Sequence, residues 1–283
     1  MIKSKRRVPL SRLTTFQTKG TVRKSIIFAS VSGLQDFVQA NRQFCVIGRG
    51  SNSLIDPKMK RGPIIRISPD ILPTYIDGED MYVNAGITVN RLMDICKERG
   101  LTGLEFTAGV PASLGGMIAM NFGCWGEEIS DWIHSVQLID ELGNIQWLDK
   151  KDLHFEYRSS IFHHQKWVVL GALLNLKADS REAVAQRIKQ AVARRLKTQP
   201  LRERTFGSVF KNPPGKFAGQ LIESLGYKGR VENGVKMSEM HANFMVNVGE
   251  AGFQEARALI QKIQKEVQTQ YGIELELEVQ IKS

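Results

Sequence analysis

The chain is short of cysteine and of long apolar stretches, and each shortage excludes a class of protein. Its 283 residues include only Cys45, Cys96 and Cys124, which are far apart and form no C-x-x-C pair. This excludes a disulfide framework and a cysteine-ligated zinc site, and it fits a reducing compartment. No apolar run approaches the roughly 20 residues that span a bilayer, and the N-terminus lacks the apolar middle of a signal peptide. We expect a cytoplasmic protein with no membrane partner.

Acidic residues are fewer than basic ones, and the formal net charge is +10. The excess is either a basic surface that aids solubility or a preference for anionic partners. Basic residues concentrate in KSKRR (3–7) and ARRLKTQPLRER (193–204), and neither stretch contains an aromatic side chain. Platforms that stack single-stranded bases need such side chains, so small anionic ligands are favoured over nucleic acid.

Apolar periodicity separates a β-rich first part from a helical last part. Short strand-like runs dominate residues 25–170, helices are expected near 33–40 and 89–99, and DELGN (140–144) predicts a hairpin. From residue 180 the pattern predicts an amphipathic helix over 180–197 with apolar positions at Val184, Ile188, Val192 and Leu196. A short helix at 217–226, a strand at 243–248, a long helix from 253 and an alternating strand over 273–281 follow.

Two glycine-rich segments lie in the β-rich part. The first, around Gly48 to Asn52, lacks the third glycine and the following helix of a dinucleotide fingerprint. Its backbone N–H groups could still converge on a phosphate, although an ordinary hairpin turn fits the same residues. The second, residues 107–128, suits either close approach of a flat phosphate-bearing ligand or a packing turn. Together, the two segments favour a large cofactor held between two lobes.

Seven motifs in register carry a family resemblance. VIGRGSNSLI, GVPASLGGMIAMNFGCWG, YRSSIF, GSVFKNP, AGQLIESLGYKG, HANFMVN and LELEV occur in this order. The chain resembles the UDP-N-acetylenolpyruvoylglucosamine reductase family, in the shorter type without a substrate-capping insertion. This implies an α+β fold: a vanillyl-alcohol-oxidase-type FAD domain with lobes at 1–68 and 69–178, then a smaller substrate-binding α+β domain at 179–283.

The resemblance implies FAD as cofactor and NADPH as hydride donor. No histidine lies near the first glycine segment, so we expect FAD to be noncovalent. Arg49 departs from the family, in which many members have a small residue there. The implied FAD contacts are Gly48, Arg49, Gly50, Ser51, Asn52, Ser53, Val110, Pro111, Ala112, Ser113, Gly115, Gly116, Asn121, Gly123 and Arg195.

The family reaction reduces an enolpyruvyl ether to a lactyl ether. The resemblance implies Ser208 as the proton donor to the carbanion, Arg158 as partner of the substrate carboxylate, and Glu278 as an orienting group. From the residues alone, Ser208 also fits a turn, Arg158 a surface ion pair, and Glu278 a solvated strand face. Tyr157, Lys211 and Asn212 are expected to hold the substrate. His241 and Asn243 either donate to a ligand or brace the last domain.

Two rival functions are consistent with parts of the pattern. Another flavin oxidoreductase of the same fold, acting on a hydroxy acid, would not explain GSVFKNP or LELEV. A basic nucleic-acid-binding module would bind no flavin. No acidic or histidine cluster has metal-ligand spacing, so we expect no metal, and we expect a monomer.

Overall fold

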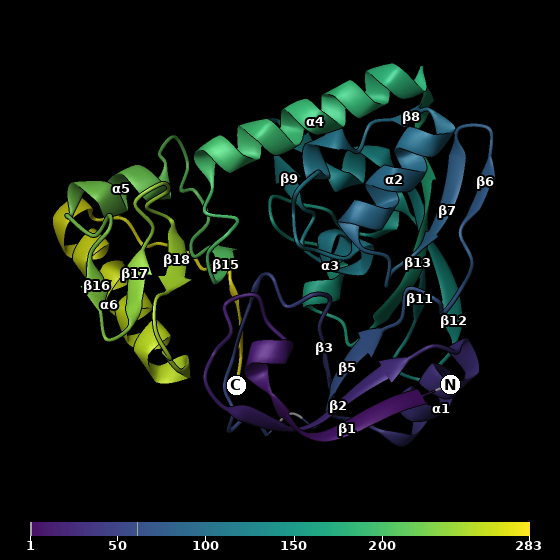
Figure 1. Ribbon diagram of the computed structural model, residues 1–283. Coiled ribbons are helices and arrows are strands. Elements are labelled where there is room, and N and C mark those ends of the chain that lie inside the picture. The colour runs from purple at the N-terminus through teal and green to yellow at the C-terminus, as the bar shows by residue number, and fades with distance from the viewer. Residues whose placement is uncertain (1, 61) are drawn as a thin grey trace. The chain divides into compact units, whose positions relative to one another are not determined.

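The computed structural model describes residues 2–60 and 62–283 (Figure 1). These residues form two compact units. Unit 1 comprises residues 2–5, 25–48 and 62–194. Unit 2 comprises residues 6–24, 49–60 and 195–283. Each unit is therefore assembled from segments that are distant in the sequence. The predicted division at residues 68 and 178 stays a prediction.

A four-stranded sheet begins the chain. Its central pairings are parallel, since β2 and β3 both pair with β5. The order is β1 (Ile2–Pro9), β2 (Thr21–Phe28), β5 (Ile64–Ile67) and β3 (Cys45–Val46), with α1 at Val31–Ala40. Strand β1 was not predicted, because its residues 3–7 are polar, mostly basic and all exposed, which leaves no apolar alternation to detect.

The main sheet of unit 1 has five antiparallel strands. The hairpin predicted at DELGN is confirmed, since Ile139 pairs with Ile145 across that turn. Helix α3 contacts the two inner strands β13 and β7, and its apolar side joins the largest core of the unit. The order is β12 (Ile145–Asp149), β11 (Ile133–Ile139), β13 (Val168–Asn175), β7 (Asp80–Asn84) and β6 (Tyr75–Asp77), with α2 at Val89–Arg99 and α3 at Leu114–Ala119.

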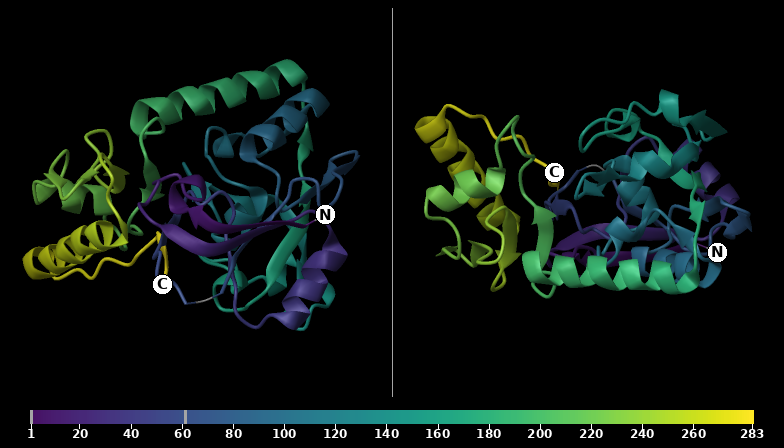
Figure 2. Two further views of the ribbon diagram at one scale, coloured as in Figure 1. Left: turned by 60° about the horizontal axis from the view of Figure 1, so that its bottom comes forward. Right: turned by 90° about the horizontal axis from the view of Figure 1, so that it is seen from above.

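Helix α4 (Arg181–Thr198) confirms the long amphipathic helix, and both views of Figure 2 show it unbroken. The Ser180 hydroxyl accepts a hydrogen bond from the Ala183 N–H at 3.2 Å, as expected for a helix cap. Val184 is fully buried, but Leu196 is 41% exposed. The prediction that Leu196 lies on the buried face is wrong, because the apolar stripe stops being covered before the helix ends.

Unit 2 contains a four-stranded antiparallel sheet and two helices. The long helix predicted from residue 253 is confirmed, and its apolar stripe is buried at Phe253, Ala256, Ile260, Ile263 and Val267. Phe16 and Leu54 join the same core from the two early segments. The order is β15 (Thr205–Ser208), β18 (Phe244–Asn247), β17 (Val235–Met237) and β16 (Val231–Glu232), with α5 at Ala218–Ser224 and α6 at Phe253–Tyr271.

The predicted terminal strand over 273–281 is wrong in extent. Only β19 (Gln280–Lys282) forms a ladder, in parallel with β4 (Ser53–Ile55). Residues 274–278 instead bond to the chain beyond β15, since the Lys211 N–H donates to the Glu276 carbonyl at 2.9 Å. The alternation of faces survives: Leu275 and Val279 are buried, whereas Glu274 and Glu276 are exposed.

The remaining elements are short. Strand β8 (Leu101–Thr102) pairs with β14 (Lys177–Ala178), and β9 (Gly123–Cys124) pairs with β10 (Glu127–Glu128). Turns of 3-10 helix lie at Leu10–Arg12, Glu105–Thr107, Ile129–Trp132, Lys150–Asp152 and Ile161–His163. Over residues 2–60 and 62–283, none of the helices has the length and apolar character that crossing a membrane requires.

Candidate active site

The first glycine loop joins β3 to β4, as the sequence predicted. Gly50 has φ +69°, and a Cβ on it would lie 2.1 Å from the Leu13 carbonyl oxygen. The glycine is therefore required by the backbone of its own unit. The N–H groups of residues 49–52 donate hydrogen bonds to no residue within the described ranges. Four consecutive free donors form the kind of nest that binds a phosphate.

The second glycine segment contains α3 and meets the first at one point in unit 1. A Cβ on Gly48 would lie 2.5 Å from the Ser113 hydroxyl and 3.6 Å from the Gly116 Cα. A Cβ on Gly115 would likewise be too close to the protein, since it would lie 2.8 Å from the Ala85 Cβ. A Cβ on Gly116, by contrast, would meet its nearest protein atom at 3.6 Å, an ordinary contact. Packing within the protein therefore does not require a glycine at residue 116, and its contact with FAD stays a prediction.

Arg158 lies on a tight turn of unit 1. The backbone groups of Glu156 and Ser159 exchange two hydrogen bonds of 3.1 Å, and Arg158 between them has φ +57°. Its Nη2 donates to the Gly123 carbonyl at 2.7 Å, and its guanidinium lies 4.8 Å from the centre of the Tyr157 ring. The side chain is thus held at two points, although it remains half-buried rather than enclosed.

Asn121 fixes the turn that carries Arg158. It is buried, and its Nδ2 donates to the Glu156 carbonyl at 3.0 Å and to Glu128 Oε2 at 2.7 Å. Because these bonds engage the side-chain amide, the FAD contact that the resemblance implies for Asn121 would have to be made by its backbone. That contact stays a prediction.

Ser208 ends strand β15 in unit 2, and its hydroxyl is half-exposed. Within the part of the chain that the structure describes, this hydroxyl has no hydrogen-bond partner. The preceding Gly207 has φ +83°, and a Cβ on it would lie 3.8 Å from the Ser51 carbonyl oxygen. The free hydroxyl therefore follows a residue that neighbours the glycine loop.

Glu278 lies beside the same strand end. The N–H groups of Glu278 and Val279 both donate to the Val209 carbonyl, at 2.9 and 3.2 Å. The Asn52 side chain donates to the Glu278 carbonyl at 3.1 Å, and the Asn52 carbonyl accepts from Gln280. Unit 2 thus brings together three predicted features: the glycine loop, Ser208 and Glu278.

The other predicted residues of unit 2 are engaged to different degrees. Lys211 forms an ion pair with Glu276 at 3.3 Å, and the Asn212 side chain accepts from the Ala218 N–H at 3.0 Å. Arg195 is 2% exposed and donates to Gln199 Oε1 at 3.0 Å. Ser53 lies in β4 and is buried. Ligand contacts by these four residues remain predictions.

The remaining predicted FAD residues of unit 1 lie before and after α3. The Ala112 N–H donates to the Val110 carbonyl at 2.8 Å, and Ser113 forms an isolated bridge with Thr88. Gly123 is confined on one side, because a Cβ on it would lie 2.6 Å from the Glu127 carbonyl oxygen.

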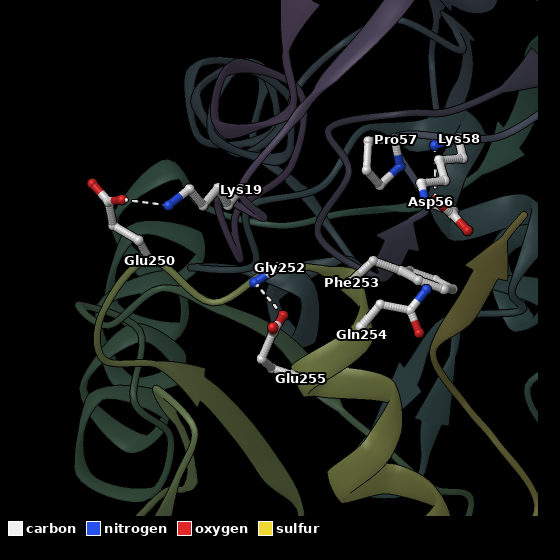
Figure 3. A pocket seen from close by; sticks show the side chains of 9 residues that line it. All are labelled: Lys19, Asp56, Pro57, Lys58, Glu250, Gly252, Phe253, Gln254 and Glu255. Atoms are coloured by element: carbon white, nitrogen blue, oxygen red, sulfur yellow. Dashed lines mark hydrogen bonds and ion pairs between the residues drawn. The ribbon is translucent and has the colours of Figure 1, made fainter.

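A separate hollow of about 320 Å³ lies in unit 2 at the start of α6 (Figure 3). Its lining contains none of the predicted site residues. Lys19 pairs with Glu250 at 3.0 Å, and Glu255 accepts from the Gly252 N–H at 2.9 Å. With three carboxylates and two lysines, its charges are mixed, so the hollow does not favour an anionic ligand. Its residues are Lys19, Asp56, Pro57, Lys58, Glu250, Gly252, Phe253, Gln254 and Glu255.

Comparison with known proteins decides between the rival flavoenzymes. Residues 29–149 match the family described as FAD binding domain, and residues 199–282 match the C-terminal domain of UDP-N-acetylenolpyruvoylglucosamine reductase. The reductase of that name from Bacillus pumilus is 36% identical over 96% of this chain and 92% of its own length. The chain belongs to this family. The UDP-N-acetylenolpyruvoylglucosamine reductase of Bacillus subtilis is 34% identical over the same shares.

The solved structure of the UDP-N-acetylenolpyruvylglucosamine reductase from Thermus caldophilus supports the assignment. It superposes with a TM-score of 0.86 at 29% identity and covers 100% of both chains. The predictions of an α+β fold, an FAD-binding oxidoreductase and this family are thereby confirmed. The sequence leaves open what Asn243 does, and the family resemblance implies only a cofactor contact for Asn121. Both residues now stand out as buried asparagines beside predicted catalytic groups.

Proposed function

We propose that this chain reduces UDP-N-acetylenolpyruvoylglucosamine to UDP-N-acetylmuramate for peptidoglycan precursor synthesis, with NADPH as reductant. The observation that carries the proposal is the free, half-exposed Ser208 hydroxyl. It lies beside the Glu278 segment, in a unit whose glycine loop has four unpaired N–H donors. Membership of the family supplies the substrate and the cofactor that this arrangement would serve.

The residues present fit FAD. The donors of residues 49–52 suit its pyrophosphate, and the open side of Gly116 suits close approach of a large planar group. FAD, when bound, supplies the hydride chemistry between NADPH and the vinyl carbon of the substrate. The protein has to exclude water, orient the substrate and manage the charge that develops on it.

Ser208 would donate the proton that completes the reduction. Addition of hydride to the vinyl carbon leaves negative charge on the neighbouring carbon and its carboxylate. A serine hydroxyl is a weak acid, but such an enolate is a strong base, so the transfer is favourable without a partner that lowers the serine pKa. A hydroxyl that is engaged by no protein acceptor is available for this step.

Arg158 and Glu278 would manage the charge. The planar guanidinium of Arg158 can pair with the substrate carboxylate through two N–H groups and stabilise the negative charge as it grows. Glu278 would orient the intermediate or assist proton delivery, from a segment bonded to Val209, the residue after Ser208. Tyr157, Lys211 and Asn212 would hold the substrate.

We also place the reaction in the cytoplasm, in a monomer that acts on small molecules rather than nucleic acid. Cys45, Cys96 and Cys124 take part in no disulfide within residues 2–60 and 62–283, which fits a reducing compartment. Gel filtration of the purified protein tests the monomer.

Stopped-flow absorbance of the flavin on each half-reaction tests the proposed function. In Ser208→Ala, reduction by NADPH should stay near the wild-type rate, because that step creates no carbanion. Reoxidation by the UDP-enolpyruvyl substrate should fall about 10²–10⁴-fold, the usual loss for a general acid. Ser208→Cys should keep part of the activity, because a thiol offers a proton at nearly the same place. Two outcomes would contradict the proposal. One is that UDP-N-acetylenolpyruvoylglucosamine fails to reoxidise the reduced wild-type enzyme. The other is that it reoxidises Ser208→Ala at the wild-type rate.

A further inference from the structure

Asn243 holds the two residues that follow Ser208. It precedes β18 in unit 2 and is 3% exposed. Its Oδ1 accepts from the Phe210 N–H at 3.1 Å, and its Nδ2 donates to the Phe210 carbonyl at 2.8 Å. Its own carbonyl accepts from the Val209 N–H at 2.8 Å. Three hydrogen bonds from one residue therefore fix the backbone of two consecutive residues.

The sheet fixes this stretch only as far as the Ser208–Phe244 pair and its flanking bond to Val209. The register between β15 and β18 shifts between Thr205 and Ser208, and Gly207 within that shift has φ +83°. Strand β15 then ends at Ser208. The Asn243 side chain takes the place of the ladder bonds that a continuing strand would have made, because its amide offers one donor and one acceptor, as a peptide group does.

The position of the serine hydroxyl depends on this support. A serine has a single side-chain torsion before its oxygen, so its reach is set by the backbone at residues 207–209. Val209 also accepts the N–H groups of Glu278 and Val279, so the same clamp fixes the backbone segment of Glu278. A shift of about 1 Å at a reacting group can reduce a rate about 10²-fold.

We propose that Asn243 is a positioning residue, which holds the Ser208 hydroxyl where it delivers its proton. The proposal rests on the proposed function of Ser208. Both polar atoms of the Asn243 side chain are bonded to Phe210, and burial leaves it almost no surface for a ligand. Asn243 therefore acts through the backbone of residues 209–210 and not by contact with the substrate.

Asn243→Ala and Asn243→Gln test the inference in the flavin-loaded enzyme. In Asn243→Ala, reoxidation by substrate should fall roughly 10–10²-fold, while flavin reduction by NADPH and the substrate dissociation constant change less than twofold. Asn243→Gln keeps the amide but displaces it by one methylene, so it should recover part of the lost rate. It also allows the inference to be tested if Asn243→Ala folds poorly. Amide hydrogen exchange should show the Phe210 N–H losing protection in Asn243→Ala.

Val267→Ala is the matched control. Val267 is fully buried in the core of the same unit, on α6, and its side chain forms no hydrogen bond, so its truncation lowers stability and leaves the hydrogen bonds of residues 209 and 210 in place. It should leave the ratio of the two half-reaction rates unchanged. If Asn243→Ala behaves like Val267→Ala at equal melting temperature, the residue only stabilises the fold and the inference fails.

Other outcomes separate the inference from the proposed function. Wild-type reoxidation in both Asn243 variants, together with slow reoxidation in Ser208→Ala, would overturn the inference and leave the function standing. Wild-type reoxidation in Ser208→Ala would overturn the function itself. Weakened substrate binding with an intact rate in the Asn243 variants would assign Asn243 to substrate contact instead.

Discussion

The two units hold their predicted catalytic residues by different means. In unit 1 the long Arg158 side chain is held at its far end, by the Gly123 carbonyl and the Tyr157 ring. In unit 2 the short Ser208 side chain has no hydrogen-bond partner among the residues that the structure describes, and the backbone after it is held by Asn243. A flexible side chain needs its tip fixed, whereas a side chain with one torsion needs its backbone fixed.

A buried asparagine serves each arrangement at a different distance. Asn121 donates to the Glu156 carbonyl, two residues before Arg158, whereas Asn243 bonds to the residues directly after Ser208. Arginine has enough rotatable bonds to absorb a small movement of its turn, and serine does not. The comparison therefore predicts that unit 2 tolerates less backbone movement near its reacting group than unit 1.

Among the variants that compare the two units, Arg158→Lys is expected to have the largest effect. It keeps the charge but loses the planar fork and the stack on Tyr157, so reoxidation by substrate should fall about 10²-fold while NADPH still reduces the flavin normally. Arg91→Lys, on an exposed part of the same unit, is the control and should leave both rates unchanged. Equal loss in both half-reactions of Arg158→Lys would show that this residue supports the fold or binds NADPH.

A glycine from each unit offers the next test. Gly116→Ala in unit 1 meets no close protein atom, so the apoprotein should keep its melting temperature, while affinity for FAD falls about tenfold through overpacking against the ligand. Gly50→Val in unit 2 should lose flavin and also melt roughly 5–15 °C lower. Positive φ and the clash with Leu13 together cost about 2–5 kcal/mol.

Flavin absorbance per protein and thermal melts of the apoproteins measure both variants. Full flavin retention in Gly116→Ala would place the cofactor away from α3. Full retention in Gly50→Val would reject the glycine loop as the FAD phosphate site.

The smallest effect concerns the stability of the fold in acid, and it depends on Glu105 in unit 1. Burial favours a raised pKa for Glu105, but hydrogen bonds from Thr102, the Gly103 N–H and Arg187 outweigh it and lower this pKa below its ordinary range. A lowered folded pKa adds stability above the ordinary carboxyl pKa, and that stability is lost as pH falls through the folded value.

Glu105→Gln should therefore melt a few degrees lower than wild type at pH 7, and the difference should shrink below about pH 4. Melting temperatures between pH 7 and 3 measure this, with Asp179→Asn as a more exposed comparison on the same arginine. A constant difference at all pH values would mean that the carboxylate charge contributes nothing.

Local patterns predicted most elements of both units. The spacing of Phe253, Ala256 and Ile260 identified α6, and the DELGN turn identified the β11–β12 hairpin, because both depend on residues close in the sequence. The motifs gave the family and the candidate residues. Their roles in holding one another were not visible in the sequence.

What the sequence could not show depends on contacts between distant segments. The positive φ of Arg158 occurs in a turn that is braced by Asn121, 37 positions earlier. The terminal segment lost its ladder because its partner is the irregular chain beyond Ser208. Asn243 has only HANF as a local signal, and that motif fits a ligand contact as well as a clamp. Its bonds to a residue 33 positions away decide between them.

The discontinuous make-up of unit 2 also constrains how the protein is made. Phe16 and Leu54 belong to the core that includes Phe206 and Val279, and the Phe16 and Phe206 rings lie 4.7 Å apart. During translation at about 5–20 residues per second, Leu54 leaves the ribosome roughly 10–45 s before Val279. For that interval the early apolar side chains have no core to enter. A chaperone that binds nascent apolar segments should therefore associate with the first 60 residues, and a fragment beginning at residue 195 should not fold alone.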